Sequence, residues 1–299
     1  MNGSSTPTRV LSTLGFATSC LLLLAGCAIT GSAATSGADI DTFMQIRWPA
    51  AAHLGPDGSL YYVYDPDGIF QLYKIPPGKT QADALKLTTF EDGVGGYSVS
   101  DDGKWMTVTA ATGGSEQDDL YLMNATTGQM ETLFTDPAVV YCNAVWRRDS
   151  RAFAYRANDE SPSDFHVYYM DLQDRTPCKL VSGSGFHYAA DFNRDGSRLV
   201  IGTFLSATHS KLFEVTVTTG EIREITPADE QWAFSPVGYS ADGRTFLVTA
   251  NYHGDLRSLK AIDLETGAIN DLLPELQGLE LDGAVMNEDR TILAVLVNE

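Results

Sequence analysis

Basic residues are scarce in this sequence. Twenty Lys and Arg stand against 39 Asp and Glu among 299 residues, so the formal net charge is −19. A protein that binds nucleic acid needs clustered positive charge to release the counterions of the phosphate backbone. The composition therefore argues against nucleic acid as a partner. An acidic surface keeps a protein soluble, but it does not identify what the protein binds.

Metal-binding patterns are also missing. Asp65, Asp67 and Gly68 follow the order of a calcium loop, but the later ligands of such a loop are absent, so we expect a turn there. The histidines lack the His-x-His or His-Glu-x-x-His spacing of metal sites. They are His53, His166, His187, His209 and His253. We expect no metal and no other cofactor.

A long hydrophobic run occurs only near the N-terminus. Residues 10–24 are apolar and follow Arg9, and the run is too short to cross a bilayer as a helix. This pattern indicates a secretory signal peptide over residues 1–26. Its end, Leu24-Ala25-Gly26-Cys27, resembles the lipobox of bacterial lipoproteins. The resemblance implies a lipid on Cys27 and a place on the periplasmic side of the outer membrane; ordinary signal cleavage nearby is the alternative.

The rest of the chain repeats. After a small, polar stretch that reads as a tether (residues 27–42), similar turns recur in "GPDGSLYYV", "SDDGKWMTV", "RRDSRAFAY", "NRDGSRLVI", "SADGRTFLV" and "NEDRTILAV". Their third turn residues lie 45, 47, 46, 47 and 47 residues apart. These anchor residues are Gly58, Gly103, Ser150, Gly196, Gly243 and Arg290. A period of this length is typical of propeller repeats.

Each anchor starts a strand. Large apolar residues stand three and five positions after every anchor, which is the period of a strand with one buried face. A second hairpin follows in each complete repeat, with tight turns at Gly128, Gly220 and Gly267. The sequence therefore predicts an all-β fold, a β-propeller of five four-stranded blades plus a two-stranded partial sixth blade. We predict it over residues 43–299, incomplete at the C-terminus.

The blades resemble TolB-like repeats and, more closely, the propeller of bacterial prolyl oligopeptidase family serine peptidases. The stretches that carry this resemblance are "FEDGVGGYSVSDDGKW", "ATGGSEQDDLYLMNATTG", "FHVYYMDL", "FLSATHSKLFEV" and "LAVLVNE". In that family the propeller covers a C-terminal α/β-hydrolase domain with a Ser, Asp and His triad. This sequence has no Gly-x-Ser-x-Gly elbow, and it lacks the about 250 residues that a further domain of that kind would occupy. No catalytic residue can be carried over.

Other acidic residues offer weaker alternatives. Five-bladed sugar hydrolases use paired carboxylates on inner strands, and here only Asp191 and Asp282 lie near such positions. Glu116 is interpreted as a lone acid in a loop. We predict no catalytic pair.

One face of the propeller carries aromatic residues. The loops between blades share this face with the loops that join second and third strands, and aromatic side chains with scattered polar groups suit contact with a peptide or protein. The candidate binding residues are Tyr97, Tyr141, Phe186, His187, Tyr188, Trp232 and Phe234. Packing between blades is the alternative interpretation.

The functional hypothesis is a non-catalytic, lipid-anchored propeller that acts as the substrate-gating, peptide-binding half of a prolyl oligopeptidase-like peptidase, or a truncated relative of it. The alternative is a TolB-like interaction scaffold in the periplasm. Cys142 and Cys178 are predicted to stay free, because innermost and outermost strands of one blade lie about 14 Å apart and a disulfide needs Cα atoms within about 7 Å.

Overall fold

Strands form almost all of the regular structure in the computed structural model, which describes residues 40–298. The chain divides into two units, and the first ends at Ile46. Within the described part of that unit lies one short helix, α1 (Ile40–Phe43). The second unit, from Arg47 onward, holds every described strand. In the described part of the chain, no helix has the length and apolar character needed to cross a membrane.

The strands fall into consecutive antiparallel groups. We call each four-stranded group a blade. The first contains β1 (Ala50–Leu54), β2 (Leu60–Tyr64), β3 (Gln71–Ile75) and β4 (Leu85–Lys86), and the second β5 (Gly96–Val99), β6 (Trp105–Ala110), β7 (Asp119–Asn124) and β8 (Met130–Phe134). The third contains β9 (Tyr141–Trp146), β10 (Ala152–Ser161), β11 (Asp164–Asp171) and β12 (Cys178–Val181). The fourth contains β13 (Phe186–Phe192), β14 (Arg198–Ser206), β15 (His209–Thr216) and β16 (Ile222–Glu224), and the fifth β17 (Phe234–Tyr239), β18 (Thr245–Ala250), β19 (Ser258–Asp263) and β20 (Ile269–Asp271). A hairpin of β21 (Glu280–Met286) and β22 (Leu293–Asn298) follows; two 3-10 turns are η1 (Gln81–Asp83) and η2 (Pro274–Leu276).

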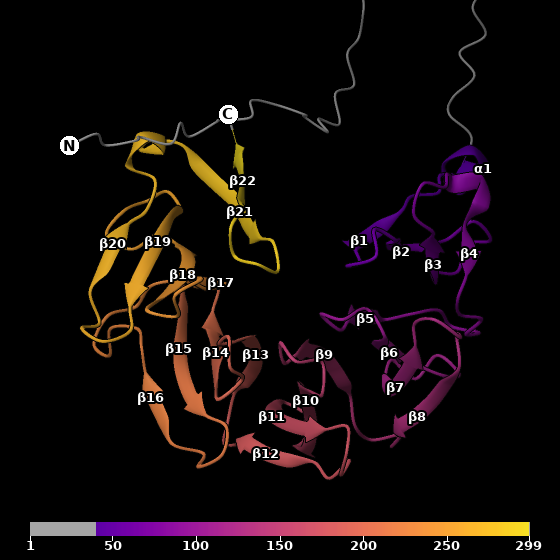
Figure 1. Ribbon diagram of the computed structural model, residues 1–299, viewed down its shortest axis with the longest axis horizontal. Coiled ribbons are helices and arrows are strands. Elements are labelled where there is room, and N and C mark those ends of the chain that lie inside the picture. The colour runs from indigo at the N-terminus through magenta and orange to yellow at the C-terminus, as the bar shows by residue number, and fades with distance from the viewer. Residues whose placement is uncertain (1–39, 299) are drawn as a thin grey trace, which may run out of the picture. The chain divides into compact units, whose positions relative to one another are not determined.

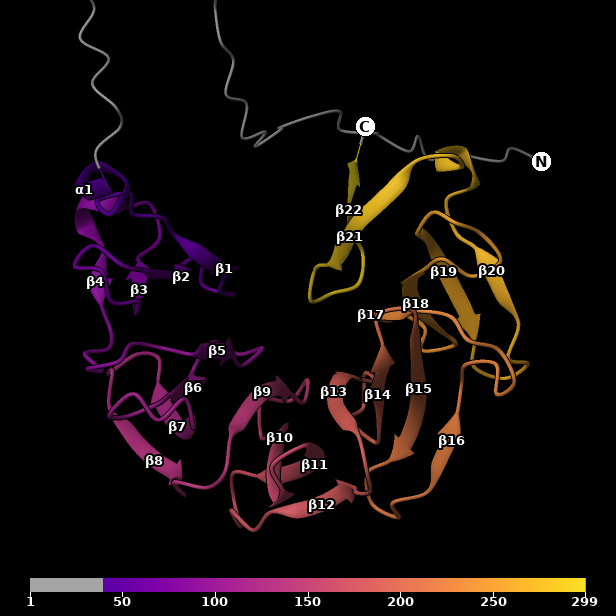
Figure 2. The same ribbon diagram turned by 180° about the vertical axis from the view of Figure 1, so that it is seen from behind.

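The blades are arranged around a common centre, with the first strand of each nearest to it (Figures 1 and 2). These inner strands contact one another in sequence, from β5 through β9, β13 and β17 to β21. Four clusters of buried apolar side chains fill the interfaces between consecutive blades. The prediction of an all-β propeller is confirmed. One detail was not predicted, because a parallel pairing of Phe165 with Phe186 joins the third and fourth blades into one eight-stranded sheet.

The repeated turns explain the period of the sequence. All six anchor residues have a positive φ, between 59° and 79°. Glycine adopts this conformation without steric cost, whereas other residues do not. At Gly103 a Cβ atom would also lie 2.8 Å from Pro56 Cγ. The repeat therefore marks a left-handed turn between the first and second strands of each group.

Two anchors are not glycine, and both use their side chains to reach another blade. Ser150 Oγ accepts a hydrogen bond of 2.9 Å from the backbone N–H of Asp102 in the second blade. The Arg290 guanidinium crosses to the fourth blade, where its Nη2 lies 2.7 and 2.6 Å from the two carboxylate oxygens of Asp191. At these two anchors a residue other than glycine thus adopts the positive φ, and its side chain makes a contact that glycine could not make.

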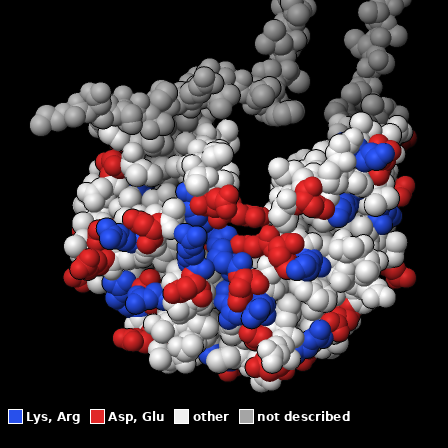
Figure 3. Space-filling model, in the orientation of Figure 1, with Lys and Arg blue, Asp and Glu red and all other residues white. Residues whose placement is uncertain are grey.

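Asp191 is the centre of a wider ion network. Arg148 joins it to Asp101, with distances of 3.0 Å to Asp191 and 3.0 Å to Asp101. The backbone N–H of Tyr239 donates to Asp191 at 2.8 Å, and Arg290 donates to the Tyr239 carbonyl at 3.0 Å. Charged side chains of both signs gather at the middle of the face shown in Figure 3. Residues from the third and fifth blades and the last hairpin therefore bond to one carboxylate of the fourth blade, and Arg148 links it to the second blade.

Replacing Asp191 with Asn is expected to destabilise the protein by about 3 kcal/mol. The substitution leaves two partly buried guanidinium groups without their shared carboxylate, and breaking such a pair costs far more than losing a surface charge. Burial raises the pKa of Asp191, and Arg148 together with backbone N–H groups acts against this rise. Urea unfolding is therefore best measured at pH 8.

The control for this variant is Asp229→Asn, which removes an exposed carboxylate and should change the free energy of unfolding by less than about 0.5 kcal/mol. Equal effects of the two substitutions would contradict a structural role for the Asp191 network.

A second buried carboxylate joins the fourth and fifth blades. Glu214 is 4% exposed and accepts hydrogen bonds from Arg198 Nη1 at 2.6 Å, Arg223 Nη2 at 2.8 Å and the Tyr239 hydroxyl at 3.0 Å. Burial by itself would raise the pKa of Glu214, but these hydrogen bonds outweigh burial and hold the pKa below its usual value. The ionised form is therefore stabilised by folding.

Glu214→Gln should lower the free energy of unfolding at pH 7 by about 1–3 kcal/mol, a reduced figure because both arginines are about half exposed. Since the folded pKa is lowered, this contribution is present above the unfolded pKa of about 4.3 and is lost as the pH falls through the folded value. Unfolding measured from pH 7 to pH 2 should show the difference from wild type shrinking below about pH 4. Glu221→Gln alters an exposed side chain and is the control, so its free energy of unfolding should stay close to that of wild type. A difference between Glu214→Gln and wild type that grows in acid would refute the assignment.

The two described cysteines are unpaired, as predicted. Cys142 lies in β9 opposite Arg156, and Cys178 lies in β12 opposite Tyr169. They occupy the first and last strands of the third blade, with two strands between them.

Candidate functional site

The predicted aromatic residues lie at or just before the starts of inner strands. Tyr97 in β5 donates its hydroxyl to the Ala51 carbonyl. Tyr141 in β9 stacks on Phe134, with ring centroids 5.4 Å apart. Trp232, just before β17, donates its indole N–H to Glu230 at 2.6 Å.

Phe234 is 3% exposed and packs in the core between the fourth and fifth blades. The packing interpretation therefore describes the surroundings of Tyr141 and Phe234. Of the other predicted residues, Phe186 and Tyr188 of β13 lie beside a cation that sequence reasoning missed.

That cation is Arg156. It lies in β10 and faces the fourth blade, where its guanidinium carbon is 4.3 Å from the ring centroid of Phe186 and 5.4 Å from that of Phe165. Its Nε donates to Cys142 Sγ at 2.9 Å. Together with Tyr188, these residues form what we call the Arg156 cluster: Arg156, Cys142, Phe165, Phe186 and Tyr188.

The electrostatics of the Arg156 cluster keep its neighbours neutral. Burial raises the pKa of the Cys142 thiol, and the positive charge of Arg156 only partly offsets this. Burial likewise raises the pKa of Tyr188, against the influence of Arg156. No carboxylate of the described residues forms an ion pair with Arg156, so the cluster carries one uncompensated positive charge.

His187 points to the other side of β13 from Phe186 and Tyr188, as alternation along a strand requires. Its Nδ1 lies 2.8 Å from Thr203 Oγ1, whereas Nε2 is buried without a hydrogen-bond partner. Burial lowers the pKa of His187. The side chain is therefore neutral at pH 7 and stands apart from the charged cluster.

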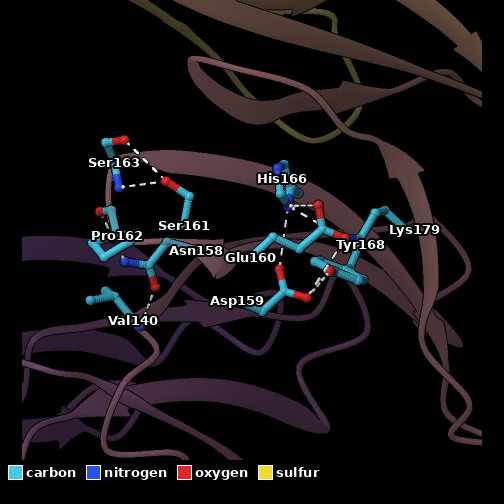
Figure 4. A network of polar contacts seen from close by, with 10 residues as sticks. All are labelled: Val140, Asn158, Asp159, Glu160, Ser161, Pro162, Ser163, His166, Tyr168 and Lys179. Carbon is cyan, nitrogen blue, oxygen red and sulfur yellow. Dashed lines mark hydrogen bonds and ion pairs between the residues drawn. The ribbon is translucent and has the colours of Figure 1, made fainter.

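The hairpin that carries Arg156 is held by a polar network (Figure 4). His166 Nδ1 lies 3.3 Å from Asp159 Oδ1, and the Tyr168 hydroxyl donates to the same carboxylate. Lys179 from β12 lies 2.6 Å from Glu160 Oε1. These contacts tie β10 and β11 to the outer strand of the blade.

The tip of this hairpin is fixed as well. The Asn158 side chain accepts from the backbone N–H of Val140 at 2.6 Å and donates to the Pro162 carbonyl at 3.2 Å. A histidine beside a carboxylate could activate a serine, but Ser161 and Ser163 contact each other at 3.1 Å and neither bonds to His166. The network therefore positions the hairpin and contains no nucleophile–histidine pair.

The remaining sequence candidates are also placed. Asp191 is held by Arg290 and Arg148, and Asp282 is an exposed residue of β21, so the pair does not offer the two free carboxylates of a glycosidase. Glu116 is exposed in the loop before β7, and Gly68 has the positive φ of a turn. Within residues 40–298, no group of three or more His, Cys, Asp or Glu could hold a metal ion. Cys27 lies outside the described residues.

These features define a β-propeller. The chain belongs to the family described as prolyl oligopeptidase, N-terminal β-propeller domain, which it matches over residues 91–296. No curated protein matches the chain.

Solved structures show the same fold at low sequence identity. A prolyl endopeptidase, studied for the role of inter-domain dynamics in catalysis and specificity, is 15% identical with a TM-score of 0.68, covering 85% of this chain and 40% of its own. Prolyl oligopeptidase B from Galerina marginata, bound to a 35-residue hydrolysis and macrocyclisation substrate, is 16% identical with a TM-score of 0.65 over 81% of this chain and 39% of its own. The same enzyme with a 25-residue macrocyclisation substrate is 14% identical with a TM-score of 0.65 over 85% and 41%. The chain thus spans about two fifths of the length of these proteins.

Proposed function

We propose that this propeller is the non-catalytic, substrate-gating half of a prolyl oligopeptidase-like peptidase, and that it binds peptides at the end of the blades where the Arg156 cluster lies. The observation that carries this proposal is the family match over residues 91–296. It is supported by the solved relatives, which include an oligopeptidase bound to peptide substrates of 25 and 35 residues.

The propeller acts by excluding folded proteins and by binding peptides, and it carries out no chemical step. A ring of blades admits an extended chain more readily than a folded domain. The longest hairpins support this role: β10 and β11 have 10 and 8 residues, and β14 and β15 have 9 and 8. The corresponding strands of the other blades, β2, β3, β6, β7, β18 and β19, have only 5 or 6 residues. The third and fourth blades therefore extend beside the Arg156 cluster and flank it.

Peptide binding without peptidase activity is the expected behaviour of residues 28–299. A fluorescein-labelled, proline-containing decapeptide should bind and show a raised fluorescence anisotropy. Unlabelled decapeptide should displace it and lower the anisotropy, whereas an equal concentration of folded lysozyme should not. No serine should react with a fluorophosphonate probe above a heat-denatured control. Labelling of the native chain would contradict a non-catalytic role, and selective binding of folded proteins would favour an interaction scaffold.

Lipid attachment at Cys27 is the second part of the proposal, based on the sequence Leu24-Ala25-Gly26-Cys27. Cells that express the full chain and are fed an alkyne-tagged palmitate should yield a labelled protein in the membrane fraction. Cys27→Ser should abolish the label, while Cys142→Ser should retain it. Equal labelling of the Cys27→Ser variant would show that Cys27 is not the acceptor.

A further inference from the structure

Arg156 differs from most other basic residues of the described chain in how its charge is balanced. Most Lys and Arg of residues 40–298 lie within 4 Å of a carboxylate, as expected for a chain with a net charge of −19. Several without an ion pair, such as Arg151 and Arg244, are exposed to solvent. Arg156 is half-buried and has no such partner among the described residues. Desolvating a charge is costly unless it is paired, so this position calls for an explanation.

The contacts of Arg156 use Nε and the faces of its guanidinium, but not the edge formed by Nη1 and Nη2. Phe165 and Phe186 lie against it as cation–π partners, and Nε is used by Cys142 Sγ. Nη1 and Nη2 have no hydrogen-bond partner among the described residues. These are the two nitrogens that can bind both oxygens of a carboxylate at once, and a guanidinium held in place loses little entropy when it does so.

The surroundings of that edge are apolar and aromatic. Phe204 is 51% exposed and lies edge-on to Phe186, with ring centroids 6.5 Å apart. Tyr188 lies against Gly202, where an added Cβ would be 2.3 Å from Tyr188 Cζ, and its hydroxyl has no hydrogen-bond partner among the described residues. An apolar group next to the carboxylate would find ring surface here.

We propose that Arg156 binds a carboxylate carried by an apolar ligand, either the C-terminal carboxylate of a peptide or an acidic side chain within it. This inference rests on the proposed peptide-binding function and names the chemical group that the site selects. Arg156 is a binding residue, Cys142 positions its guanidinium, and the rings contact the ligand's apolar part.

The test separates the carboxylate from the peptide. Binding of 4-fluorobenzoate and of 4-fluorobenzamide is followed by ¹⁹F NMR, because the two probes differ in charge and share the ring. Three labelled tripeptides follow: one with a free C-terminus, one amidated, and one amidated with an internal Glu. Wild-type protein should prefer 4-fluorobenzoate by at least about tenfold, the value of a charged hydrogen-bonded pair.

The variants are Arg156→Met, which keeps an apolar stem against the rings, and Arg156→Lys, which keeps the charge but not the planar fork. Arg156→Met should remove the preference for 4-fluorobenzoate, and Arg156→Lys should keep only part of the wild-type preference. Arg151→Met is the matched control, since it removes the same charge from an exposed residue just before β10, and it should bind like wild type. Circular dichroism and thermal melting establish that each variant is folded.

Each outcome has one meaning. Preference for the free C-terminus or for the internal Glu identifies the source of the carboxylate. Peptides that bind equally as acids and amides, with no effect of Arg156→Met, would overturn this inference and leave the proposed function standing. Binding of 4-fluorobenzoate that depends on Arg156, with no peptide bound, would support the carboxylate site and contradict the peptide-binding function. Failure of every probe to bind would overturn both.

Discussion

The carboxylate of Asp191 is the contact on which the arrangement of the blades depends. Each blade is a sheet of short strands that buries its faces only against its neighbours, so a blade has little stability alone. The apolar clusters between blades are non-directional, whereas the bonds from Arg148, Arg290 and the Tyr239 backbone have fixed geometry. Together they set the position of each inner strand relative to the next.

This contact gives the two ends of the inner strands different chemistry. β13 has Phe186 at its start and Asp191 near its end, five residues and about 16 Å further on. At the Asp191 end, ion pairs from Arg148 and Arg290 to Asp191 hold the turns together. At the Phe186 end, the positive charge of Arg156 has no ion-pair partner among the described residues and lies among aromatic rings. The end with a half-buried, unpaired arginine is the one that we propose binds a ligand.

The period of the fold could be predicted from the sequence, because the positive-φ turn and the alternation of apolar residues are local signals. The departures of Ser150 and Arg290 from glycine were visible too, but their meaning depends on partners in other blades. Arg290 and Asp191 are 99 residues apart, and nothing near either residue identifies the other. The sheet that joins the third and fourth blades was missed for the same reason.

The proposed Arg156 cluster shares only two residues with the set predicted from the sequence. Aromatic residues at strand starts included Phe186 and Tyr188, which belong to the proposed Arg156 cluster, yet the same signal selected Phe234, which is buried in the core. Arg156 was overlooked because a lone arginine in a strand has no distinctive spacing. Its role became visible only when the fold showed that it lacks a carboxylate partner while being packed between two rings.

The most direct test of this account is amide hydrogen exchange of the folded chain with and without a bound proline-containing decapeptide. The account predicts slower exchange in β13 around Phe186 and in the β10–β11 hairpin, with no change in the turns that contain Arg148 and Arg290. Protection of those turns, with none around Phe186, would show that the peptide binds at the opposite end of the blades and would contradict the assignment.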